Sequence, residues 1–181
     1  LYLNDGRGNL TRSSQILPSG ITFESTSTVK ATDFDSDGDQ DLFVGVRLKP
    51  FYYGMPMKGY ILANDGKGTF SDITKDVAPE LETLGMITDA SWADIDGDND
   101  DDLVVVGEYM PVTIFRNDRG RLTNETYSGG LQMTNGWWNS IEAADLDLDG
   151  DIDFVIGNHG LNSKFRASPT KPICMYVHDF D

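Results

Sequence analysis

Aspartate residues gather in three short windows of the sequence, at the spacing of oxygen ligands around a hard cation. The windows span residues 33–41, 94–102 and 145–153 and hold sixteen Asp between them. In each window carboxylates occupy alternate positions, so their side chains can turn toward one point, and Ca²⁺ takes six to eight such oxygens. The sequence therefore predicts about three calcium sites. Their predicted ligands are Asp33, Asp35, Asp37, Asp39, Asp41, Asp94, Asp96, Asp98, Asp100, Asp102, Asp145, Asp147, Asp149, Asp151 and Asp153.

An EF-hand, a metal-free acidic turn and a magnesium site each fit these windows less well. An EF-hand needs a bidentate Glu at position 12 of its loop, whereas that position holds Val44, Val105 and Ile156. In a solvated acidic turn without metal, five or six carboxylates within nine residues would repel one another. Mg²⁺ demands a tighter octahedron and retains its water ligands, so we favour calcium.

A second motif, Asn-Asp-Gly or a shorter version of it, alternates with the acidic windows. It begins at Asn4, Asn64 and Asn117, and from these residues to the next window the distances are 29, 30 and 28 residues. Asn and Gly tolerate the positive φ that tight hairpin turns require. We therefore predict a hairpin at each Asn and, because two motifs keep a constant spacing three times, a repeated structural unit.

The windows begin 61 and 51 residues apart, a period suited to one blade of a β-propeller. Counted from the first Asp of each window, the predicted units are residues 1–32 (partial), 33–93, 94–144 and 145–178, with a next unit starting at Asp179. Both ends of the chain fall inside repeats. We therefore expect a segment of a longer array, with about three units.

Short apolar runs separated by turn residues predict an all-β fold of antiparallel strands. The expected strands are VKAT, LFVGV, YILA, LVVVGEY, VTIF, DFVIG and ICMYV. Only residues 76–86 have a helical character, and that segment is short. The single cysteine, Cys174, lies in the ICMYV run and is expected to be a small buried residue.

The composition argues against two classes of partner. The formal charge is −16, and no basic patch of the kind that binds phosphate backbones is evident, so nucleic acid is not an expected partner. No uninterrupted apolar run is long enough to cross a bilayer, so we expect no membrane insertion of this segment.

The pattern D-x-D-x-D-G-x-x-D, followed by an apolar strand and Gly and alternating with N-D-G-x-G turns, resembles the FG-GAP/VCBS repeats of integrin-α-like β-propellers. The resemblance covers nearly the whole chain. It implies four-stranded blades, usually seven to a ring, with an acidic loop that binds Ca²⁺ between two strands of each blade. About three blades would lie in this chain. Residues 135–165 look like the bacterial branch that includes proteins with UnbV-type C-terminal domains.

The resemblance implies a non-catalytic recognition or adhesion module of a secreted or surface protein, located outside the cell, on its surface or in the periplasm. A protein or a glycan is the expected ligand, and no catalytic residue is predicted. Because three blades cannot close a ring, we expect missing chain or another molecule to complete the open ends. Asn99, where the other windows have Gly, is expected to weaken its loop only slightly.

The alternative function is that of a polysaccharide-active propeller enzyme, a lyase or hydrolase whose catalytic loops lie partly outside this chain. Such an enzyme should show a cleft where His159, Arg166 or Arg116 and free carboxylates converge, whereas a recognition module should show a broad surface with aromatic residues. Two aromatic groups could serve either the core or such a surface. They are Trp137 with Trp138, and the cluster Phe51, Tyr52, Tyr53, Met55, Met57 and Tyr60.

Overall fold

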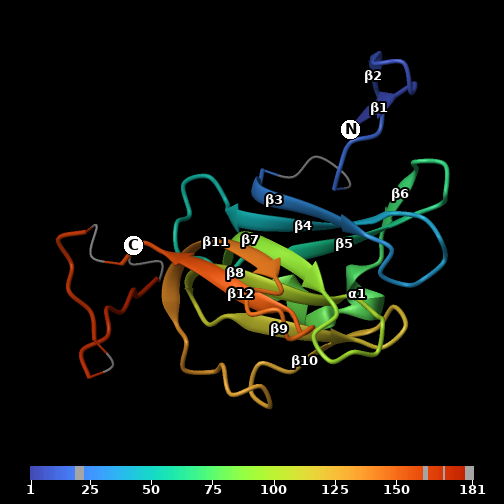
Figure 1. Cartoon of the computed structure of the whole chain (residues 1–181). Coiled ribbons are helices and arrows are strands. Elements are labelled where there is room, and N and C mark those ends of the chain that lie inside the picture. Colours follow the sequence, from blue (N-terminus) through green and yellow to red (C-terminus); the bar gives the residue numbers. More distant parts are fainter. Residues whose placement is uncertain (19–22, 161–162, 169, 178–181) are drawn as a thin grey trace.

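The computed structural model describes residues 1–18, 23–160, 163–168 and 170–177, and the chain there is built almost wholly from antiparallel strands (Figure 1). The first sheet contains β3 (Ser25–Thr32), β4 (Asp41–Leu48), β5 (Gly59–Asn64) and β6 (Phe70–Asp72), in that order. The next four strands, here called the second sheet, are β7 (Met86–Ala93), β8 (Asp102–Met110), β9 (Thr113–Asn117) and β10 (Leu122–Asn124), each paired with the next.

Each of these two sheets is a meander with the same two connections. An acidic loop joins its first strand to its second, and an Asn-Asp-Gly-type turn joins its third strand to its fourth. In both sheets the turn Asn pairs with the first residue of the fourth strand, Asn64 with Phe70 and Asn117 with Leu122, although the second turn is one residue shorter. Units counted from the acidic windows therefore run from the second strand of one sheet to the first strand of the next. The predicted unit start at Asp179 lies outside the described residues.

Two further strand pairs each show half of this meander. The N-terminal hairpin, β1 (Tyr2–Asn4) and β2 (Leu10–Arg12), contains an Asn-Asp-Gly turn and stands away from the sheets (Figure 1). The C-terminal pair, β11 (Gly136–Ala144) and β12 (Asp153–Asn158), contains the third acidic loop. The first residues of β11 also pair with the end of β8, so the C-terminal pair is joined to the second sheet.

The sheets pack face to face in chain order, with an apolar core in each space between them. Phe43 and Ile61 of the first sheet belong to the same buried cluster as Leu103, Val105 and Phe115 of the second. The next core contains Val104, Val106, Val112 and Ile141, with Phe154 and Ile156 packed against it. Successive residues of β8 therefore face opposite cores, as the period of two along a strand requires. This burial is the main source of stability expected for such a fold.

Each first strand carries a β-bulge six residues before the first Asp of its acidic loop. The pairing register skips Ser27 in β3, Thr88 in β7 and Asn139 in β11. The Ser27 hydroxyl donates to the carbonyl of Ile87 at 2.7 Å. The Thr88 hydroxyl donates to the carbonyl of Trp138 at 2.9 Å. Because a bulged residue has no partner in its own ladder, its side chain is free to bond the backbone of the next sheet.

Asp89 of β7 makes a second polar link between sheets. Its carboxylate accepts hydrogen bonds from the Thr28 hydroxyl at 2.9 Å and from the Ile141 N–H at 3.1 Å, and it forms an ion pair with Lys30. Burial on its own would raise the pKa of Asp89, but these hydrogen bonds favour the carboxylate and lower that pKa below its usual value. Asp89 thus stays ionised while it joins the first strands of three successive sheets.

The all-β prediction is confirmed, and the short helical segment is found close to where it was expected. The helical turns are α1 (Thr74–Val77), which begins two residues before the expected segment, and the 3₁₀ turn η1 (Pro79–Thr83), which lies within it. Among the described residues no helix is long and apolar enough to span a bilayer. The strand expected at residues 173–177 is wrong, because this segment pairs with no described strand, and Cys174 is exposed rather than buried.

Candidate metal sites

Each acidic loop brings carboxylate oxygens together. In every loop, one oxygen from each of three Asp residues lies within 4.8 Å of the other two. The groups are Asp33, Asp35 and Asp37; Asp94, Asp96 and Asp102; and Asp145, Asp147 and Asp153. Positions 1 and 3 of the window contribute in all three loops, and position 5 or 9 completes the group. The remaining predicted ligands, Asp39, Asp41, Asp98, Asp100, Asp149 and Asp151, lie in the same loops but outside these groups.

The backbone of each loop curls around its first aspartate in the same way. The N–H of position 6 donates to Oδ2 of the first Asp at 3.0–3.1 Å, from Gly38 to Asp33, from Asn99 to Asp94 and from Gly150 to Asp145. The three donors have φ values of 98°, 72° and 97°, the left-handed region in which Gly and Asn are tolerated. The loops therefore share one conformation although Asn replaces Gly in the second.

Three carboxylate oxygens in the first loop are buried without a hydrogen-bond partner. They are Asp33 Oδ1, Asp39 Oδ1 and Asp41 Oδ2. A buried carboxylate oxygen without a partner is costly, because it has lost its hydration and gained nothing in return. An oxygen-seeking cation would satisfy such atoms. The residues present therefore fit a Ca²⁺ ion, whose ligands are carboxylate and carbonyl oxygens.

The charge crowding in these loops changes the acidity of several carboxyl groups. Burial raises the pKa of Asp41 to about 6. Burial and the neighbouring Asp37 charge raise the pKa of Asp35, and burial raises that of Asp102. A raised carboxyl pKa means that the ionised form is disfavoured in the absence of a counter-charge. A divalent cation bound in the loop would supply that charge.

Asparagines of the hairpin turns hold the ninth position of the first two loops through their backbone. The Asn64 N–H donates to Asp41 Oδ1 at 2.8 Å, and the Asn117 N–H donates to Asp102 Oδ1 at 2.7 Å. Both acceptors are only 2% exposed. Sequence reasoning did not assign this role to either asparagine. The constant spacing between each turn and the next acidic window was the sequence signal that linked the two motifs. In the structure, however, each turn bonds the acidic loop that precedes it in the chain, which belongs to the same sheet.

The second loop differs from the first because an arginine lies against it. Arg116 of β9 forms an ion pair with Asp96, one of the three clustered carboxylates. The N–H of Arg119 donates to Asp100 Oδ2 at 3.0 Å. The position that corresponds to Arg116 in the first sheet, directly before the turn asparagine, is Ala63. Only the second of these two sheets therefore places a side-chain cation at this point.

The residues considered for catalysis are engaged with separate partners. His159 stacks on Trp137 with ring centroids 4.8 Å apart, and Arg166 donates to the backbone carbonyl of Ser163. Arg116 is occupied by Asp96. These contacts place the three side chains in different surroundings rather than around one cleft.

The two aromatic groups divide between core and surface. Trp138 packs against the core beside β12, whereas Trp137 stacks with His159. In the second group Met57 and Tyr60 are buried. Four neighbours in the connection between β4 and β5 are exposed, namely Phe51, Tyr52, Tyr53 and Met55. This connection follows the end of β4 opposite its acidic loop, so the exposed aromatic side chains and the first carboxylate group lie at different ends of the first sheet.

Comparison with known protein families gives one result, which agrees with this geometry. The FG-GAP-like repeat matches the chain twice, over residues 51–105 and over residues 94–156. Together the two matches cover more than half of the chain and include the second and third acidic loops. No curated protein matches the chain significantly.

Proposed function

This chain belongs to the FG-GAP-like repeat family, and from that membership we propose that it is a calcium-braced recognition module of a secreted or cell-surface protein. The three loops would each hold one Ca²⁺, and the ion would be structural. Proteins or glycans would bind elsewhere on the sheets. Each part of this proposal is supported by a different set of residues.

The unpartnered oxygens of the first loop carry the calcium assignment. Asp33, Asp39 and Asp41 each bury an oxygen that accepts no hydrogen bond, and a bound cation would satisfy such atoms. The donor set is made of oxygen alone, which favours Ca²⁺ or Mg²⁺ over zinc or copper. The dense, irregular arrangement of carboxylates suits the flexible shell of calcium better than the strict octahedron of magnesium.

Calcium would act by locking the connection between the first two strands of each sheet. An ion that binds only the folded chain stabilises it by mass action. With micromolar affinity and millimolar free calcium, each site would contribute about 4 kcal/mol. A fold stabilised in this way by millimolar free calcium would suit a secreted or surface location.

The recognition role is supported by the connection between β4 and β5. Phe51 is fully exposed, and Tyr52 and Tyr53 next to it are about half exposed. Aromatic side chains exposed together on a loop offer large contact area at low entropic cost, which is typical of surfaces that bind proteins or sugars. No corresponding convergence of catalytic groups favours the enzyme alternative among the residues described above.

A calorimetric Ca²⁺ titration of chelator-stripped protein tests the metal assignment. We expect a stoichiometry near three, with one site lost in each of the variants Asp35→Ala, Asp96→Ala and Asp147→Ala. Asp76→Ala, which removes an exposed carboxylate of α1, is the matched control and should leave all sites intact. A stripped protein that is folded by circular dichroism but takes up no calcium would contradict the proposal.

A further inference from the structure

The second acidic loop carries one carboxylate more than the first. Residues 94–102 hold six Asp, whereas residues 33–41 hold five, and the additional one is Asp101. Its carboxylate accepts a hydrogen bond from the Thr32 hydroxyl of the first sheet, a donor that brings no positive charge. Without a metal ion the second loop therefore has the greater negative charge to balance, and a nearby cationic side chain would stabilise it more.

Arg116 supplies a positive charge within that loop. Its guanidinium forms an ion pair with Oδ2 of Asp96, which belongs to the same carboxylate group as Asp102. Phe115 pairs with Leu103 in the antiparallel ladder of β9 and β8. The next residue of β9, Arg116, therefore stands opposite Asp102. Arg116 is thus tied to the carboxylate group twice, by the ion pair with one member and by strand pairing beside another.

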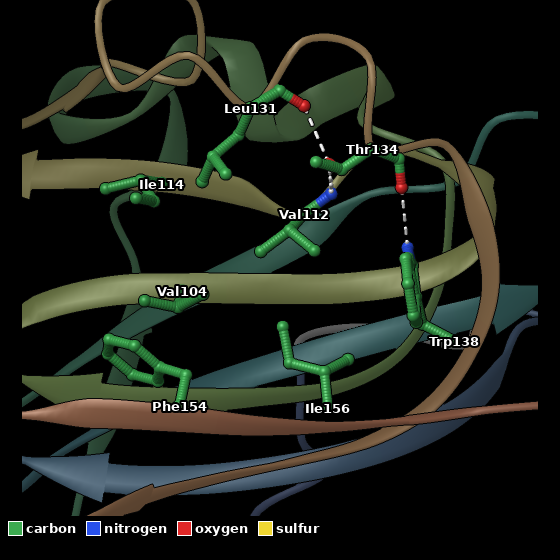
Figure 2. Close-up of a pocket in the computed structure, with 8 residues that line it drawn as sticks. All are labelled: Val104, Val112, Ile114, Leu131, Thr134, Trp138, Phe154 and Ile156. Carbon is green, nitrogen blue, oxygen red and sulfur yellow. Dashed lines mark hydrogen bonds between the residues drawn. The ribbon is translucent and has the colours of Figure 1, made fainter. Parts of the chain in front are cut away.

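The side chain of Arg116 leaves β9 on the side that faces away from the first sheet. Phe115 is buried in the core shared with the first sheet, and the Asn117 side chain bonds a carbonyl group of that sheet. Ile114 points the other way, into an apolar groove that β12 also lines (Figure 2). Because side chains alternate along a strand, Arg116 lies on the side of Ile114. A substitution of Arg116 therefore leaves the side-chain bonds of Asn117 in place.

The first sheet has no cation at the corresponding place. Ala63 directly precedes the turn Asn there, as Arg116 does in the second sheet, and both stand opposite the ninth Asp of their windows. The first loop keeps three buried carboxylate oxygens without a hydrogen-bond partner, whereas the second loop, all of whose residues are described, has none. The first loop is therefore open to a metal ion in a way that the second is not.

The two loops differ most directly at the third position of the window. Asp35 and Asp96 each accept, through Oδ1, the N–H of the residue two positions later, at 3.3 Å in both loops. Oδ2 of Asp96 is in addition bound by Arg116, whereas no described cation forms an ion pair with Asp35. A calcium ion that takes Asp96 as a ligand competes with this guanidinium, because two cations at one carboxylate repel each other. In the first loop no ion pair has to be broken.

We propose that Arg116 is a built-in counter-ion of the second loop, which holds Asp96 while the loop is free of metal and releases it when calcium binds. The proposal rests on the calcium sites proposed above. The Arg116 side chain is 42% exposed, so on release it can turn into solvent. The ion pair stabilises the metal-free loop and lowers its affinity for calcium. Arg116 thereby sets the order of filling, with the second loop occupied after the first as free calcium rises.

Titration with calcium in the presence of a competing chelator tests this order in the 181-residue chain. The binding step abolished in Asp96→Ala reports the second loop, and the step abolished in Asp35→Ala reports the first. We expect the second-loop step to be the weaker of the two, and Arg116→Ala to lower its dissociation constant about three- to tenfold. Arg121→Ala, which removes the same charge from an exposed residue directly before β10, is the matched control and should change that constant less than about twofold.

The variant Ala63→Arg makes the reciprocal change in the first sheet. The new guanidinium would stand where Arg116 stands in the second sheet, and it should weaken the first-loop step by a similar factor while leaving the second-loop step unchanged. Ala63 is partly exposed, so the longer side chain can extend along the loop without entering the core. Circular dichroism checks that the variant is folded. A folded variant with an unchanged first-loop step would overturn the proposal.

Urea unfolding with and without calcium separates a counter-ion from a merely structural contact. In EDTA, Arg116→Ala should lower the unfolding midpoint, because the carboxylates lose their only counter-charge in that loop among the described side chains. In saturating calcium the midpoint should be unchanged or raised. Equal losses in the two conditions, or an unchanged second-loop affinity in Arg116→Ala, would overturn the role of Arg116 and leave the calcium sites standing. An unmodified protein that binds no calcium would contradict the metal assignment itself, and this proposal with it.

Discussion

Asn117 shows how much of the metal loops depends on a residue that binds no metal. It is fully buried, and its side-chain amide donates to the carbonyl of Phe34 at 2.7 Å and to the carbonyl of Asp101 at 3.0 Å. Its own N–H holds Asp102. One residue of β9 therefore fixes the first loop, from the neighbouring sheet, and the second loop of its own sheet.

Replacing Asn117 by Ala should loosen both loops. The variant leaves the buried carbonyl of Phe34 and the partly buried carbonyl of Asp101 without their donor, so we expect a loss of about 2–3 kcal/mol in the free energy of unfolding. Urea unfolding in EDTA measures this loss without a contribution from calcium. Gln132→Ala, which removes an exposed amide, should change stability by less than about 0.5 kcal/mol. Equal losses in the two variants would refute the role of Asn117.

The raised pKa of Asp41 predicts that calcium binding at the first loop is coupled to protons. Burial raises this pKa to about 6 in the metal-free chain, so below pH 6 the carboxyl group holds a proton that calcium must displace. Calcium affinity should therefore fall as the pH falls through 6, and calorimetry at pH 5.5 and 7.5 measures the difference.

The same shift has the opposite consequence for the metal-free protein. Its folded state binds a proton more tightly than the unfolded state at Asp41, so the contribution of this group to stability grows as the pH falls from 7 toward 4. In Asp41→Asn both pH effects of this carboxyl group should disappear. A variant that retains the full pH dependence of calcium affinity would assign it to different carboxylates.

Alternate aspartates predict that the carboxylates of positions 1 and 3 lie close together, because a tightly curled loop brings near neighbours together whatever surrounds it. The structure groups Asp33 with Asp35, and Asp145 with Asp147, as that spacing predicts. The hydrogen bonds of Asn64 and Asn117 could not be predicted in this way. Their partners lie 23 and 15 residues away and are fixed by strand pairing.

Strands were predictable where two signals agreed, an apolar run and a turn of known geometry. The ICMYV run has the composition of a strand but only one of these signals, and it remains unpaired among the described residues. A strand is stable only when a neighbouring edge accepts its hydrogen bonds. Composition indicates that a segment is able to form a strand. Whether an unpaired strand edge lies next to it depends on how the sheets assemble.

The glycine that ends each second-strand run is explained by the close approach of adjacent strands. A Cβ on Gly107 of β8 would lie 2.2 Å from the backbone carbonyl oxygen of Met86, which cannot move without distorting β7. At Gly157 of β12 the nearest atom would be the hydroxyl of Ser140, at 2.6 Å. That hydroxyl belongs to a side chain and can rotate away.

These distances predict unequal effects of the same substitution. Gly107→Ala should lower the free energy of unfolding by about 2–3 kcal/mol, because overpacking forces the backbone to shift. Gly157→Ala should cost about 1 kcal/mol or less. Thermal and urea unfolding in saturating calcium compare the two variants directly. A larger loss at Gly157 would show that the β11–β12 pair is more tightly packed than its contacts indicate.

At the scale of the whole molecule, the charge of −16 is concentrated in the three acidic windows. Three bound Ca²⁺ ions would reduce the formal charge to about −10 and place the positive charge where repulsion is greatest. The metal-free chain should then be stabilised by salt, which screens repulsion between exposed carboxylates.

A salt series separates this repulsion from the direct effects of metal. Between about 0.05 and 0.5 M NaCl, roughly a threefold change in Debye length, the melting temperature in EDTA should rise by about 3–6 °C. In saturating calcium the rise should be much smaller. Differential scanning fluorimetry in both conditions provides the comparison, and an equal salt dependence in each would place the repulsion outside the metal loops.

The repeated motifs predict a recurring unit of strands, whereas the division into complete and half sheets comes from the strand pairing. Window and turn recur three times each, which predicted about three blades. Among the described residues the pairing gives two complete four-stranded meanders and two half sheets, β1–β2 and β11–β12. Sequence periodicity counts repeats, but it does not show which edges remain open.

The bulges of the first strands suggest why such an array could lengthen or shorten during its history. Ser27 and Thr88 reach across to a main-chain carbonyl of the following sheet, not to a particular side chain. Every peptide unit offers that acceptor, whatever its residue type. A duplicated repeat would therefore find a carbonyl acceptor for its bulge hydroxyl in any neighbouring repeat. Repeats joined by this bond can be inserted or removed without a matching change in the sequence of their neighbours.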